Sequence, residues 1–131
     1  MKTGMALVAS IILMGCSTMR YYPTEKITLQ EITKNDSVLS VYYSVPLETM
    51  YYSSGIDFVY NKDCSQVVIK VVRQRINTSP KVMLQSVLSR DVVDSTKLKE
   101  LGISSYMVEI PIEEHWHLSN ACDEEIVRIS D

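Results

Sequence analysis

The chain has 131 residues, with 13 basic and 16 acidic side chains and a formal net charge of −3. Such a mildly acidic balance gives no electrostatic support for binding to nucleic acid or to an anionic lipid surface. The apolar fraction of 46% is ordinary for a globular protein and argues against disorder.

The N-terminus has the pattern of a removed targeting segment. Lys2 precedes an apolar run from position 5 to position 14, which is far shorter than the roughly 20 residues of a membrane-spanning helix. The run ends in Leu13-Met14-Gly15-Cys16, which resembles the lipobox of bacterial lipoproteins. This resemblance implies that residues 1–15 are removed and that Cys16 carries covalent lipid that holds the protein to a bilayer.

The same resemblance predicts an address. In Gram-negative lipoproteins an aspartate directly after the lipidated cysteine favours retention at the inner membrane, and here that position is Ser17. We therefore expect the inner leaflet of the outer membrane, facing the periplasm. Residues 16–26 are expected to be the lipidated cysteine and a short tether, and residues 27–131 a single β-rich domain.

Removal of the signal and lipidation of Cys16 leave two cysteines, Cys64 and Cys122. In an oxidising compartment two such cysteines in a small domain most often pair, so we predict a disulfide. A metal-binding or redox pair is the alternative, but no Cys-x-x-Cys spacing supports it.

Hydrophobic periodicity indicates mostly short strands. Residues 48–55, rich in Tyr and Ser, are expected to form a loop, and residues 66–76 a central strand buried on both faces over its first half. Pro111 indicates a strand end or an edge strand. Residues 95–101 are the one expected helix, followed by Gly102 as its stop. The predicted strands cover residues 27–32, 38–45, 56–60, 66–76, 82–88, 106–112 and 125–129.

These elements predict a mainly β fold, a small antiparallel two-sheet sandwich that is immunoglobulin-like or similar. In such a sandwich the cysteine pair would suit a bridge between the sheets. A compact α+β domain with one sheet is the alternative.

Two groups of residues are candidates for a site. His115 and His117 would point the same way on an extended segment and could hold Zn²⁺ or Cu²⁺, although a usable site needs further converging ligands. Tyr51 and Tyr52 are the candidates for a binding surface, and Arg73 and Arg75 could grip a carboxylate or phosphate.

The sequence lacks the common catalytic motifs, so we expect no enzyme and no cofactor other than the lipid. The leading hypothesis is a non-enzymatic module that binds an envelope protein or a cell-wall component near the membrane. The alternatives are a periplasmic Zn or Cu protein built on His115 and His117, a lipidated immunity or inhibitor protein, and a small hydrolase.

Overall fold

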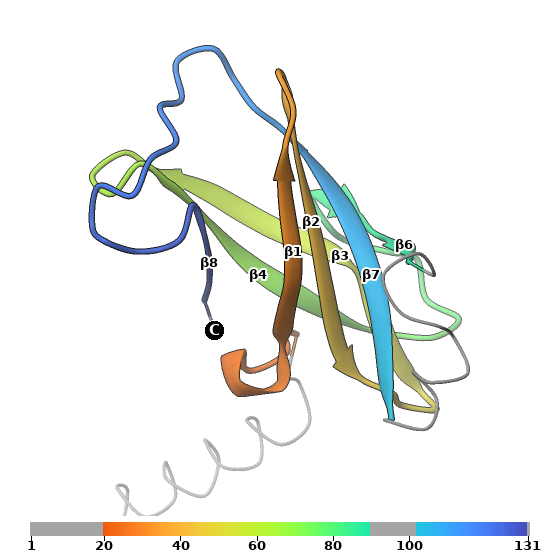
Figure 1. Ribbon diagram of the computed structural model, residues 1–131. Coiled ribbons are helices and arrows are strands. Elements are labelled where there is room, and N and C mark those ends of the chain that lie inside the picture. Colours follow the sequence, from red (N-terminus) through yellow and green to blue (C-terminus); the bar gives the residue numbers. More distant parts are fainter. Residues whose placement is uncertain (1–19, 90–101, 131) are drawn as a thin grey trace, which may run out of the picture.

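The computed structural model describes residues 20–89 and 102–130 (Figure 1). The lipobox with Cys16 and the predicted helix at 95–101 lie outside these residues. Within them, no helix is long and apolar enough to cross a membrane. The described elements are η1 (Thr24–Lys26), β1 (Thr28–Lys34), β2 (Val38–Pro46), β3 (Tyr51–Asn61), β4 (Gln66–Arg75), β5 (Leu84–Gln85), β6 (Val87–Leu88), β7 (Ile103–Pro111) and β8 (Val127–Ile129).

The described strands form two four-stranded sheets that pack face to face as a sandwich, which confirms the predicted fold class. One sheet has the order β1-β2-β7-β6 and the other β5-β3-β4-β8. Figure 1 shows β1, β2 and β7 crossing in front of β3 and β4. The β4–β8 pair is parallel, unlike the antiparallel pairing expected throughout, because β8 follows a long connection from the other layer instead of a hairpin.

The core follows from the period-two alternation that the sequence displays. Leu39, Val41, Tyr43 and Val45 of β2 are buried, and they face the alternate residues of β4, Val67, Ile69 and Val71. Val68 and Val72 on the other face of β4 are buried as well, so the predicted central strand is confirmed. Pro111 is the last residue of β7, as its missing N–H donor predicts.

The region 48–55 differs from the expected loop, because β3 already begins at Tyr51. Its register against β4 shifts between Tyr52 and Gly55, so Ser53 and Ser54 occupy a bulge. Both serines are buried with hydroxyl partners: Ser53 Oγ lies 2.6 Å from Tyr43 Oη, and Ser54 Oγ donates to Gln74 Oε1 over 3.4 Å. Small polar residues, typical of loops, therefore continue the strand here.

The predicted strand at 82–88 is two short strands in different sheets. β5 pairs with β3, whereas β6 pairs with β7 in the opposite layer. Ser86 lies at the crossing, where its N–H donates to Ser54 O over 2.9 Å and its Oγ lies 2.7 Å from Tyr43 Oη. Burial of the Tyr43 ring between the sheets raises the pKa of its hydroxyl to about 12.

Residues 20–22 belong to the fold, so its boundary lies closer to Cys16 than the sequence predicts. Tyr21 forms an antiparallel bridge with Val72, and two backbone hydrogen bonds flank it. Tyr22 N donates to Val71 O over 2.9 Å, and Arg73 N donates to Arg20 O over 2.7 Å. The Tyr22 ring is 2% exposed and is part of the core.

Cys64 and Cys122 form the predicted disulfide, with an S–S distance of 2.01 Å and 58 residues of sequence separation. Cys64 lies in the β3–β4 turn and Cys122 in the connection from β7 to β8. The expectation of a bridge between the sheets is wrong, because neither cysteine lies in a strand. The bond instead fastens the last long connection to the β3–β4 turn, beside the hydrogen bond from Ser119 N to Ser65 O.

Replacing both cysteines (Cys64→Ser/Cys122→Ser) should lower the free energy of unfolding by about 4 kcal/mol, the value that the chain-entropy model gives for this loop length. Urea unfolding of the oxidised protein and of the variant measures the difference. Equal urea midpoints would show that the bond contributes nothing to stability.

Gly55→Ala should also destabilise the protein, because a Cβ at Gly55 would lie 1.9 Å from the backbone oxygen of Leu84. Since neither strand can move freely, we expect a loss of about 1–3 kcal/mol. Hydrogen exchange locates the damage: the Ser86 amide, bonded to Ser54 O, should exchange much faster in the variant than in the parent. Unchanged exchange at Ser86 would contradict this close packing of β3 and β5.

Candidate functional site

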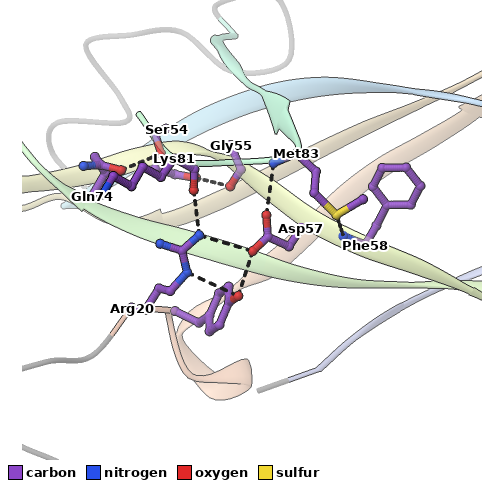
Figure 2. Close-up of polar contacts among 10 residues, drawn as sticks. Arg20, Ser54, Gly55, Asp57, Phe58, Gln74, Lys81 and Met83 are labelled. Atoms are coloured by element: carbon purple, nitrogen blue, oxygen red, sulfur yellow. Dashed lines mark hydrogen bonds and ion pairs between the residues drawn. The ribbon is translucent and has the colours of Figure 1, made fainter. Parts of the chain in front are cut away.

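A single carboxylate on the outer face of β3 joins three separate parts of the chain (Figure 2). Asp57 Oδ2 accepts a 2.7 Å hydrogen bond from Tyr21 Oη and lies 3.4 Å from Arg20 Nη2. Asp57 Oδ1 accepts from Met83 N over 3.0 Å. Arg20 Nη2 also donates to Lys81 O over 2.6 Å. We call Arg20, Tyr21, Asp57 and Met83 the Asp57 latch.

The environment of Asp57 keeps its carboxylate charged. Partial burial by itself raises its pKa, but hydrogen bonds from Tyr21 and Met83 and the positive charge of Arg20 outweigh that effect. The pKa of Asp57 therefore lies below its ordinary value. The latch thus fixes the start of the described chain to β3 and to the segment that leads into β5.

A groove of about 320 Å³ lies beside the latch on the outer face of β3 and β4. Val59 and Met83 at the groove are 63% and 57% exposed. Lys70 Nζ stands 5.2 Å from the centroid of the Tyr21 ring and makes no ion pair among the described residues. We call this the outer groove; its lining residues are Tyr21, Asp57, Phe58, Val59, Val68, Lys70 and Met83.

The predicted binding residues Tyr51, Arg73 and Arg75 come together where β3 begins and β4 ends. Tyr51 lies directly opposite Arg75, and the Arg73 guanidinium lies 3.7 Å from the centroid of the Tyr51 ring. Tyr52 pairs with Gln74 on the other face. We call residues 47–52 and 73–76 the Met50 end.

Arg73 is already occupied by a carboxylate of this chain. Its Nε and Nη2 donate to the two oxygens of Glu48 over 3.0 and 2.6 Å, a bidentate pair that lowers the pKa of Glu48. The pair covers Tyr22, whose buried hydroxyl has no well-formed hydrogen bond among the described residues. Burial, and then the negative charge of Glu48, raise the pKa of Tyr22. Arg73, paired with Glu48, therefore covers the core at the Met50 end and is not free to bind an external anion.

The two histidines lie apart from both surfaces, in the connection after β7. Both are exposed, and His115 Nδ1 lies 3.4 Å from Glu113 Oε2. Residues 20–89 and 102–130 contain no group of three potential metal ligands. Trp116, between the two histidines, stacks on Tyr60 of β3 with the ring centroids 4.9 Å apart, and it packs against the core. The histidine segment therefore holds the β7–β8 connection against β3.

A larger hollow of about 710 Å³ lies where the sheets part between the edge strands β1 and β8. Apolar side chains such as Ile27 and Val127 line it together with Asp123, Glu124 and Glu125. Arg128 lies 3.9 Å from Glu124, so its charge is partly balanced within the chain. Neither hollow was predicted from the sequence. One signal for the outer groove is nevertheless present in it, because Asp57 is the only charged residue of β3.

Comparison with known proteins adds no relative. No family model matches the chain, and neither the curated proteins nor the solved structures give a significant match.

Asp57→Asn should destabilise the protein by about 2 kcal/mol at neutral pH, because charge-assisted hydrogen bonds are lost. The folded pKa of Asp57 lies below its unfolded value, so the stabilisation is complete above about pH 4 and is lost as the pH falls through the folded pKa. The difference between parent and variant should therefore shrink in acid, as measured by urea unfolding across pH. Asp36→Asn, at an exposed position in the β1–β2 turn, is the control and should show neither effect. A pH-independent difference would contradict a charged latch.

Proposed function

We propose that this protein is a lipid-anchored, non-enzymatic binding module of the bacterial cell envelope. Lipid on Cys16 attaches it to the outer membrane, and the domain faces the periplasm. The lipobox supports the anchor, and the Cys64–Cys122 bond suits an oxidising compartment. The pairing of Arg20 with β4 supports a close attachment, because the fold then begins four residues after Cys16.

The outer groove is the surface that we propose for the partner, and it is the observation on which the binding function rests. It combines apolar walls with the cation of Lys70, which lies opposite Asp57 on the neighbouring strand but makes no ion pair among the described residues. The side chains of Val59 and Met83 are largely exposed to solvent at this groove, so their burial by a partner would be favourable. The bridging of Asp57 to Tyr21 and Met83 keeps the groove preformed, which reduces the ordering cost of binding.

The chemistry of the groove indicates the occupant. A volume of about 320 Å³ accommodates a few side chains, not a folded domain. We propose that an envelope protein inserts an apolar side chain between Val59 and Met83 and places a neighbouring carboxylate near Lys70 Nζ. Burial of the apolar side chain would supply most of the affinity, and the ion pair would supply specificity.

The test is photo-crosslinking in living cells with a photoreactive amino acid at Val59 or Met83 of the full-length protein. We expect one discrete adduct from both positions, identified by mass spectrometry. Val87 on β6 is the control, since it is 57% exposed but belongs to the other sheet, and it should give no such adduct. Lys70→Glu should reduce the adduct several-fold, because it opposes the partner's carboxylate.

Two results would contradict this proposal. Equal adducts at Val59, Met83 and Val87 would indicate random collision, and an adduct that is indifferent to Lys70→Glu would exclude the proposed ion pair. The anchor is tested separately: Cys16→Ser should move the protein from the membrane fraction to the soluble fraction.

A further inference from the structure

The direction in which the chain enters the sandwich determines which end lies nearest to the lipid. Residues 20–22 run antiparallel to β4, so Arg20 is the residue of this segment closest to the C-terminal end of β4. Arg20 O accepts from Arg73 N, and Ile76 lies only about 10 Å further along that strand at strand spacing. Cys16 lies four residues before Arg20 and can be at most about 14 Å from it. A bilayer holding Cys16 is therefore close to the Met50 end.

The Met50 end exposes apolar side chains where a water-facing turn would be polar. Leu47, Met50 and Ile76 are 52%, 45% and 36% exposed. Ile76 N donates to Met50 O over 2.9 Å, so the backbones of these two residues are adjacent. Tyr51, half-buried beside them, is of a residue type enriched at membrane–water interfaces.

The charge at this end is the opposite of the charge of the whole chain. Residues 47–52 and 73–76 carry two basic side chains, Arg73 and Arg75, and one acidic side chain, Glu48. Glu48 is paired with Arg73. The exposed Arg75 has no ion-pair partner among the described residues, which leaves its positive charge available to anionic headgroups.

We propose that the Met50 end rests on the surface of an anionic bilayer. Leu47, Met50 and Ile76 enter the headgroup layer, and Arg75 lies against lipid phosphates. This inference depends on the lipid anchor at Cys16 proposed above. It adds an orientation: β3 rises from the bilayer, so that Val59, about 26 Å from Tyr51 along the strand, stays in the periplasm.

The test uses the full-length acylated protein in vesicles, with a polarity-sensitive fluorophore on Met50→Cys. The disulfide and the lipid leave this thiol as the one available for labelling. We expect emission to shift to shorter wavelength in vesicles of phosphatidylcholine with phosphatidylglycerol, and to shift less in phosphatidylcholine alone. Val59→Cys is the matched control, because it is at least as exposed but lies near the other end of β3, and its emission should not change.

Arg75→Glu in the Met50→Cys background should abolish the response to phosphatidylglycerol. Arg75 makes no contact with the Asp57 latch, so this substitution leaves the latch in place.

Mass spectrometry and vesicle flotation of the same sample separate the two proposals. Acylated, floating protein with an unchanged Met50→Cys emission, or with an equal shift at Val59→Cys, would overturn the proposed orientation and leave the anchor intact. Protein without acyl chains on Cys16 would overturn the anchor and this inference together.

Discussion

The short antiparallel pairing between residues 20–22 and the end of β4 is the constraint on which the rest of the structure depends. Two backbone hydrogen bonds and the buried Tyr22 ring hold the segment on its inner side, and Asp57 holds Arg20 and Tyr21 on the outer side. The folded domain therefore begins four residues after Cys16, the proposed lipidation site. If Cys16 is lipidated as proposed, the domain has few orientations available relative to its membrane.

Two different surfaces follow from that constraint. The Met50 end lies nearest to the proposed anchor and combines exposed apolar side chains with Arg75, which suits contact with anionic lipid. The outer groove lies along β3 and β4 and includes Tyr21, so the segment 20–22 forms one of its walls. In the proposed arrangement, one surface meets the bilayer and the other is presented sideways to a partner protein.

Alternation predicted the strands, because residues such as Leu39 and Val41 lie on the same face of a strand, and the number of short strands then favoured a sandwich over a one-sheet α+β domain. It could not predict the bulge at Ser53 and Ser54, where tertiary partners satisfy two buried hydroxyls. The Asp57 latch could not be predicted from the sequence either, since the partners of Asp57 come from the distant positions 20, 21 and 83. Net charge says nothing about local charge: the chain is acidic as a whole, but the exposed Arg75 at the Met50 end has no ion-pair partner among the described residues.

The pairing of residues 20–22 with β4 is tested most directly by native-state hydrogen exchange at the Tyr22 and Arg73 amides of the full-length protein. Both amides donate across the pairing of residues 20–22 with β4, to Val71 O and Arg20 O. We expect protection at both sites comparable to that of core amides in β2 and β7. Exchange at the rate of an exposed turn amide would contradict this pairing, because the domain would then hang on a free tether and neither proposed surface would have a fixed position at the membrane.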